Sequence, residues 1–217
     1  DPHGPLSPPP EWIDRGYEPD TSAVTDEQLT RLAASPLYRG GRHTGVRSRR
    51  ELAELLRLYD AEIRYTDHLV GQMCAYLKKR GWYDDCAVIL SADHGEQYGE
   101  GQMILEHGTV HDSCIHIPML LKLPGGAHRG EVCAHPVYGL DIAPAAARFF
   151  GVAAPEMWHG TALQDTLDGT AAPREYLVCE HGLYTCQRAV LQDGWKMVHT
   201  FSPGLWDFAE YALYHTE

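Results

Sequence analysis

An Asp-His-Gly step directly follows a short apolar run in the sequence. The run covers residues 86–92, and Asp93, His94 and Gly95 come next. A carboxylate oxygen and a neutral imidazole nitrogen both bind divalent metal ions, and glycine lets the backbone turn tightly beside a ligand. Because open α/β sheets bind ligands beyond the carboxyl ends of their strands, Asp93 and His94 are candidate metal ligands. The alternative is an N-capping aspartate beside a surface histidine.

Other polar residues follow in the next loop. Glu96 and Glu100 could surround a metal site, but we expect both on a solvated face, because glutamate is seldom buried. His107 and His111 have the spacing of a zinc-binding helix pair. No glutamate follows His107 and Gly108 disfavours a helix, so we do not expect a zinc helix here.

The surrounding segments have the patterns of an α/β sheet. A capping box at Ser48 opens a helix of roughly 30 residues, or about 45 Å, whose apolar residues recur at helical spacing. The apolar runs 86–92 and 117–123 are typical of strands that helices cover on both faces. Asp141 is expected to cap a further helix that ends at Phe150. We therefore predict part of a mixed, mostly parallel sheet flanked by helices.

The pattern changes after about residue 170. Short alternating runs replace the helical spacing, and Asp193-Gly194 is a strong hairpin signal. We predict a first domain over residues 1–165 and a truncated antiparallel subdomain over residues 166–217. The sequence opens in a proline-rich loop without methionine, so we expect a piece of a longer protein.

Composition excludes several classes of function. The formal net charge of −12 repels phosphate backbones, so no nucleic-acid partner is expected. No apolar run is long enough for a transmembrane helix. The six cysteines include no Cys-x-x-Cys pair, which argues against a structural zinc site. The sequence assigns neither a compartment nor an oligomeric state.

Four segments carry a recognisable order of motifs. The stretch over residues 93–125 contains Asp93-His94-Gly95, then His107-Gly108, Asp112 and His116-Ile117-Pro118. The others are the opening DPHGPLSPPPEW, the long helix that leads into the apolar strand, and GLDIAPAAARFFGV over residues 139–152. Together they resemble the sulfatase family of the alkaline-phosphatase superfamily, over nearly the whole chain and in the same order.

The resemblance implies a metal-dependent hydrolysis of sulfate esters. In that family the nucleophile is a formylglycine, made from the first residue of a Cys/Ser-x-Pro-x-Arg motif, and the metal is calcium. Asp93 and His94 correspond to metal ligands. His107 stands where many members have a sulfate-contacting lysine, and His3 matches a histidine of the same pocket, so both are candidate catalytic residues. The substrate would be a sulfate ester of a small molecule or a sulfated sugar.

The departures from the family pattern keep alternatives open. The sequence has no Cys-x-Pro-x-Arg or Ser-x-Pro-x-Arg motif, so we expect the formylglycine on a preceding segment. His94 replaces the more common asparagine, and imidazole suits Mn²⁺ or Zn²⁺ better than Ca²⁺. One alternative is a phosphodiesterase or phosphonate monoester hydrolase of the same superfamily. Another is a non-catalytic domain that binds sulfated glycans.

Overall fold

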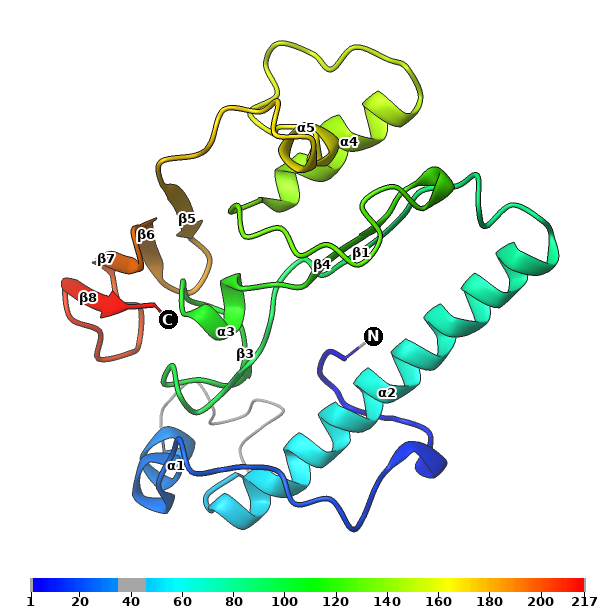
Figure 1. Ribbon diagram of the computed structural model, residues 1–217. Coiled ribbons are helices and arrows are strands. Elements are labelled where there is room, and N and C mark those ends of the chain that lie inside the picture. The colour runs from blue at the N-terminus through cyan, green and yellow to red at the C-terminus, as the bar shows by residue number, and fades with distance from the viewer. Residues whose placement is uncertain (1, 35–45, 217) are drawn as a thin grey trace.

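The computed structural model describes residues 2–34 and 46–216. In Figure 1 a two-stranded sheet occupies the middle of the molecule, with the long helix α2 on one side and the helices α4 and α5 on the other. A separate antiparallel sheet, β5 to β8, ends the chain. Within the described ranges no helix is both long and apolar enough to cross a membrane.

The first two helices begin at N-capping hydroxyl residues, and the one at Ser48 was expected. Helix α1 (Asp26–Ala33) starts after Thr25, whose hydroxyl accepts a hydrogen bond from the Gln28 backbone N–H. Helix α2 (Arg49–Lys79) starts after Ser48, whose hydroxyl accepts from the Glu51 backbone N–H. These hydroxyls satisfy backbone donors that a helix start leaves free. The long predicted helix is confirmed.

A hydrophobic core joins α1, the start of α2 and a small hairpin. The hairpin consists of β2 (Gln97–Tyr98) and β3 (Ile104–Glu106). The buried core residues are Val24, Leu29, Leu32, Val46, Leu52, Tyr98, Ile104 and Leu105. Burial of this apolar surface fixes the hairpin against the helices, and the hairpin in turn carries part of the candidate site.

The central strands run antiparallel, so the expected mostly parallel sheet is not confirmed. Strand β1 (Val88–Ser91) pairs with β4 (Met119–Lys122), and Ser91 lies opposite Met119. Between them the chain makes the β2–β3 hairpin and the short helix α3 (Asp112–Ile115). A parallel partner needs a crossover back to the start of the first strand. Here the chain enters β4 at the end where it leaves β1.

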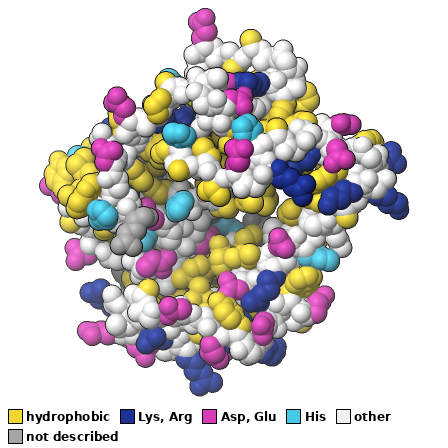
Figure 2. All heavy atoms as spheres, viewed as in Figure 1, with side chains coloured by type: hydrophobic (Ala, Val, Ile, Leu, Met, Phe, Trp, Pro, Cys, Tyr) yellow, Lys and Arg dark blue, Asp and Glu magenta, His cyan; other side chains and the backbone are white. Residues whose placement is uncertain are grey.

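Covering of the strands on both faces is also not found. In the described part of the chain, Leu90 of β1 is 38% exposed and Leu120 of β4 is 57% exposed. The space-filling view shows hydrophobic side chains along the hollow between the long helix and the sheet (Figure 2). One apolar face of the pair is therefore open.

The remaining helical elements in the described ranges are two short helices and three 3-10 turns. The expected helix after residue 141 is α4 (Ile142–Phe149), but Asp141 makes no side-chain capping bond to it. Its buried carboxylate instead accepts bonds from the Tyr138 and Thr161 backbone N–H groups and from Arg174. The other elements are α5 (Leu163–Leu167) and the 3-10 turns η1 (Pro10–Trp12), η2 (Pro124–Gly126) and η3 (Gly139–Asp141).

The antiparallel C-terminal sheet is confirmed. Its strands, in spatial order, are β5 (Leu177–His181), β6 (Cys186–Gln192), β7 (Trp195–Ser202) and β8 (Tyr211–His215). Asp193-Gly194 forms the turn between β6 and β7. Alternate residues face inward, as a half-buried sheet requires, and Ala189 and Val198 pack against Val110.

Candidate active site

Three of the four residues singled out in the sequence lie together. His3, His94 and His107 each offer one ring nitrogen, and these nitrogens lie within 4.8 Å of one another. The rings of His94 and His107 are stacked, with centroids 3.7 Å apart. The His3 ring centroid is 5.5 Å from that of His107 and 5.8 Å from that of His94. We call these three side chains the histidine cluster.

His94 reaches the cluster because the chain turns closely after β1. The Gly95 backbone N–H donates to the Cys114 carbonyl at 2.8 Å, which ties this turn to α3. A Cβ at Gly95 would lie 2.0 Å from the Ser113 carbonyl oxygen. Only glycine fits such an approach, so the Asp-His-Gly step needs its third residue for packing.

The β2–β3 hairpin places His107 beside Glu96. Gln97 pairs with Glu106, so Glu96 and His107 lie across from each other at the open end of the hairpin. The His107 Nδ1 lies 3.2 Å from the Glu96 Oε1, and the Glu96 side chain is only 3% exposed. The expectation that Glu96 lies on a solvated face was therefore wrong. No local pattern marks it, because its burial comes from the hairpin.

His3 comes to the cluster on the N-terminal loop. The Ser7 backbone N–H donates to the Glu62 Oε1 of α2 at 2.6 Å, and Leu6 packs against the hydrophobic core. These two contacts hold the loop on the body of the protein. The His3 side chain stays 48% exposed, so the cluster opens to solvent on this side.

Asp93 and His111 take different positions. The Asp93 side chain is 91% exposed, with its Oδ2 3.9 Å from the His94 Nε2. It lines the same cavity as His3 and His94 but is not among the three clustered groups. His111 caps α3 by accepting a hydrogen bond from the Ser113 backbone N–H. His107 and His111 therefore do not share a helix.

Burial controls the charge of two groups in the site. It raises the pKa of the Glu96 carboxyl, while the imidazoles of His3 and His94 oppose that rise. Burial also lowers the pKa of His107, helped by the neighbouring His94 and His3. Both shifts disfavour charge, so His107 tends toward the neutral imidazole, which can accept a proton or a metal ion.

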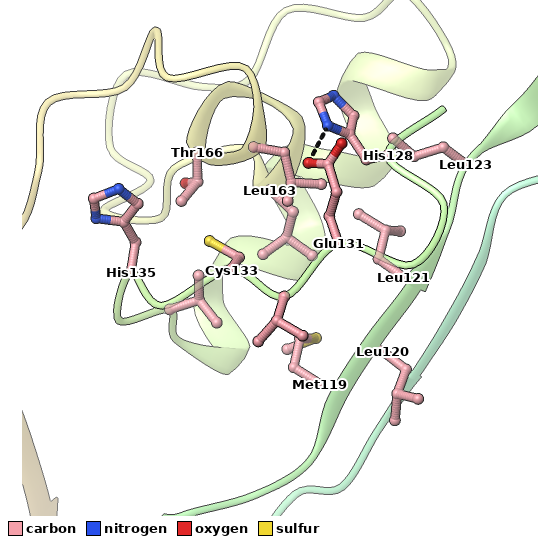
Figure 3. Close-up of a pocket in the computed structure, with 13 residues that line it drawn as sticks. Met119, Leu120, Leu121, Leu123, His128, Glu131, Cys133, His135, Leu163 and Thr166 are labelled. Atoms are coloured by element: carbon pink, nitrogen blue, oxygen red, sulfur yellow. Dashed lines mark hydrogen bonds and ion pairs between the residues drawn. The ribbon is translucent and has the colours of Figure 1, made fainter. Parts of the chain in front are cut away.

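A cavity of about 630 Å³ adjoins the cluster. Its lining includes His3, Asp93 and His94 together with Ile63 and Val70 of α2. A second cavity, of about 410 Å³, lies between β4 and α5 (Figure 3). Leucine side chains dominate the second one, and none of the clustered histidines lines it. The polar groups that could act on a substrate therefore meet at the first cavity.

The donor atoms near the cluster do not fit calcium by themselves. Calcium takes six to eight oxygen ligands. The described residues offer three imidazole nitrogens, an exposed Asp93 carboxylate and a buried Glu96 that already faces His107. Nitrogen donors suit later divalent metals.

Comparisons with known proteins agree on fold and family. The family model described as Sulfatase matches residues 1–152. The multifunctional alkaline phosphatase superfamily protein PehA of Trinickia caryophylli is 24% identical, over 69% of this chain and 30% of its own length. N-acetylglucosamine-6-O-sulfatase of Bacteroides thetaiotaomicron is 24% identical, over 53% of this chain and 20% of its own length.

A solved structure shares the fold. It is the phosphonate monoester hydrolase of Silicibacter pomeroyi, with a TM-score of 0.77 and 21% identity, covering 99% of this chain and 48% of that chain. The chain thus spans less than half the length of each of these three proteins. With a family model matching more than half of its residues, this chain belongs to the Sulfatase family.

Proposed function

We propose that these residues form one side of the active site of a sulfuric ester hydrolase. The observation that carries the proposal is the meeting of His3 on the N-terminal loop, His94 after β1 and His107 at the end of the β2–β3 hairpin, beside a cavity large enough for a small ester. Membership of the Sulfatase family supports the reaction class. The nucleophile, a formylglycine, would come from a segment outside these 217 residues, because the sequence has no motif for it.

The proposed roles follow from position. The rings of His3 and His107 lie next to that of His94, and these two histidines would contact the sulfate group and supply a proton to the leaving oxygen. Asp93 and His94 would hold a divalent ion, which supplies Lewis-acid stabilisation of the charge on the sulfate oxygens when bound. Glu96 accepts from His107 and would orient its ring.

The substrate class is a sulfate ester of a small molecule or a sugar. An N-acetylglucosamine-6-O-sulfatase among the relatives supports a sulfated sugar. The similarity to a phosphonate monoester hydrolase favours one alternative, the hydrolysis of phosphonate monoesters. Both reactions would use the same anion-binding groups, so the substrate must be distinguished by assay.

The test uses the coding sequence extended upstream by about 200 residues, a typical domain length. The purified product is assayed with an aryl sulfate and with a phosphonate monoester. We expect faster turnover of the sulfate, and an H107A variant about 100-fold slower. The matched control is H135A, because His135 lines the other cavity. Faster turnover of the phosphonate would favour the alternative, and no turnover of either substrate would contradict both.

A further inference from the structure

A third cavity, of about 690 Å³, lies where β1 begins and β4 ends. Its lining comes from the end of α2, the turn before β1 and the loop after β4. Val88 at the start of β1 pairs with Lys122 at the end of β4, whereas His94 follows the other end of β1. This cavity is therefore at the opposite end of the strand pair from the candidate active site. We call it the distal cavity.

Three cations from separate segments line the distal cavity: Lys78 of α2, Lys122 of β4 and Arg129 of the loop after η2. Figure 2 shows Lys and Arg side chains gathered over the end of α2, with acidic side chains beside them. None of the three forms an ion pair with a described carboxylate. Among the described residues, the Lys and Arg side chains that do pair with carboxylates are Arg57, Arg148, Arg174, Arg188 and Lys196.

Lys122 is the half-buried member of this group. Its Nζ donates to the Tyr83 carbonyl, and to the carbonyl oxygens of Asp84 and Cys86 at 3.1 Å and 2.8 Å. These contacts use its three donors, but they leave its charge without a counter-ion in the described part of the chain. A partly buried charge without a partner is costly, so an anion at the cavity would compensate it.

The end of the long helix explains only part of this charge. Lys78 and Lys79 lie in the last turn of α2, where cations offset the negative end of the helix dipole. Lys122 and Arg129 belong to other segments, so the dipole gives no reason for them to meet Lys78. Their convergence points to an anion that binds between the segments.

Two carboxylates, Asp84 and Glu131, line the same cavity. The His128 ring contacts the Glu131 carboxylate at 2.9 Å, so this acid already has a partner. Asp84 is exposed to water, where salt screens its charge. The local charge is therefore positive, on a chain whose formal net charge is −12.

Aromatic rings lie next to these cations. The ammonium groups of Lys78 and Lys122 lie 4.7 Å and 4.6 Å from the centre of the Tyr83 ring. The Arg80 guanidinium lies 4.7 Å from the centre of the Trp82 ring, and Trp82 is 50% exposed. Aromatic side chains offer apolar surface for packing, and Lys and Arg form charge-assisted hydrogen bonds to anionic oxygens. A sugar ring that carries a sulfate group matches both features.

We propose that the distal cavity binds a sulfate group of a sulfated sugar, as a second site that takes no part in hydrolysis. The identity of the ligand rests on the proposed function, because sulfated sugars belong to the substrate class proposed above. A nucleic acid also offers anionic oxygens, but the net charge of −12 would repel a long phosphate backbone. An oligosaccharide held here would stay near the active site at a raised effective concentration.

The test is an NMR titration of the isotope-labelled 217-residue chain with N-acetylglucosamine 6-sulfate and, separately, with unsulfated N-acetylglucosamine and with inorganic sulfate. The signal of the Trp82 indole N–H, assigned with a W82F variant, reports on the distal cavity. We expect a saturable shift with the sulfated sugar, and weaker binding as the salt concentration rises. K78A/R129A should weaken the binding about tenfold, and R129A alone about threefold.

The matched control is R31A/R50A, which removes the same charge from α1 and from the start of α2 and should leave the affinity unchanged. All four side chains are exposed, so neither double variant should unfold the chain, which circular dichroism checks. Equal losses in the two double variants would overturn the proposal. So would binding that K78A/R129A and R129A leave unchanged, or an equal response to the unsulfated sugar or to inorganic sulfate.

The titration also separates this site from the proposed function. H107A should leave the Trp82 shift unchanged, because His107 lies at the other end of the strand pair. A shift that H107A abolishes would place the ligand at the histidine cluster and contradict the proposal. Binding is measured without turnover, so absence of hydrolysis would leave the distal site in place, and absence of binding would leave the hydrolase assignment in place.

Discussion

Gly95 is the residue on which the position of His94 depends. An added Cβ would meet the Ser113 carbonyl oxygen at 2.0 Å, and the nearest atoms are all backbone of Ser113 and Cys114, which cannot rotate aside as a side chain can. G95A should lower the free energy of unfolding by about 2 kcal/mol, as overpacking does. Urea unfolding measures the change. The matched control is G182A, where an added Cβ meets nothing within 4 Å; an equal loss in both variants would contradict the explanation.

Lys196 and Asp112 form an ion pair whose two halves differ in exposure. The Lys196 ammonium lies 2.5 Å from the Asp112 Oδ1, and the side chains are 2% and 46% exposed. Removing the lysine leaves a carboxylate that water can reach, whereas removing the aspartate charge leaves a buried ammonium without its counter-ion. Breaking a buried pair costs most when a buried charge remains.

Two variants should therefore differ in stability. D112N should lower the free energy of unfolding by about 2 kcal/mol, and K196M by less than about 1 kcal/mol. The difference in the free energy of unfolding should be seen in the unfolding of the C-terminal sheet. Lys196 also donates to the Val110 carbonyl and so ties β7 to the loop before α3. A larger loss in K196M than in D112N would contradict this account.

At the scale of elements, His128 ties the loop after η2 to α5. Its ring contacts the Glu131 carboxylate at 2.9 Å and the Asp168 carboxylate at 3.0 Å, and Figure 3 shows the first of these contacts beside the second cavity. The hydrogen bonds to Glu131 and Asp168 raise the pKa of His128. Arg148 of α4 also reaches the Asp168 carboxylate, at 3.4 Å.

The pH dependence follows from the sign of this shift. A histidine whose pKa is raised on folding stabilises the fold fully below its unfolded value, near 6.5. That stabilisation disappears as the pH rises through the higher folded pKa. The Tm difference between the parent and H128N should therefore be larger near about pH 5.5 than near about pH 9.

The choice of asparagine keeps the backbone unstrained. His128 has a φ of 56°, and asparagine tolerates that left-handed conformation. H159N, at an exposed position of another loop, is the control and should show no such trend. A Tm difference for H128N that stays constant with pH would exclude the ion pairs as its cause.

Elements with local signals could be predicted, and those that depend on distant partners could not. Ser48 and its capping partner Glu51 sit three residues apart, so the start of α2 was readable from the sequence. The direction of β4 against β1 depends on the hairpin between them, whose strands have two and three residues. Strands that short leave no alternation to detect.

The residues of the candidate site likewise fall into two groups, those that the sequence predicts and those that it does not. His3, His94 and His107 could be named because each lies in a motif that resembles the family. Glu96 could not, because its burial depends on the register Gln97–Glu106 and on the ring of His107. The exposed position of Asp93 was not readable either, since an Asp-His step does not determine which side chain turns inward. Both features depend on tertiary packing.

At the scale of the whole molecule, the open apolar face matters. Ile63, Leu69 and Met73 of α2 are each more than 40% exposed, and so is Leu120 of β4. Large apolar side chains left exposed in this way often mark a contact with another part of a protein. The chain spans 48% of the length of the phosphonate monoester hydrolase that shares its fold.

The last prediction concerns these 217 residues expressed alone: they should not hydrolyse an aryl sulfate. Formylglycine forms from a Cys/Ser-x-Pro-x-Arg motif, which the sequence lacks, and without a nucleophile covalent catalysis is lost. Turnover is measured with added Ca²⁺, Mn²⁺ or Zn²⁺ and compared with a D93A variant. Turnover well above that variant would mean that a nucleophile lies within these residues, and the cavity beside His94, whose lining includes Ser91 and Ser113, would be the first place to look for it.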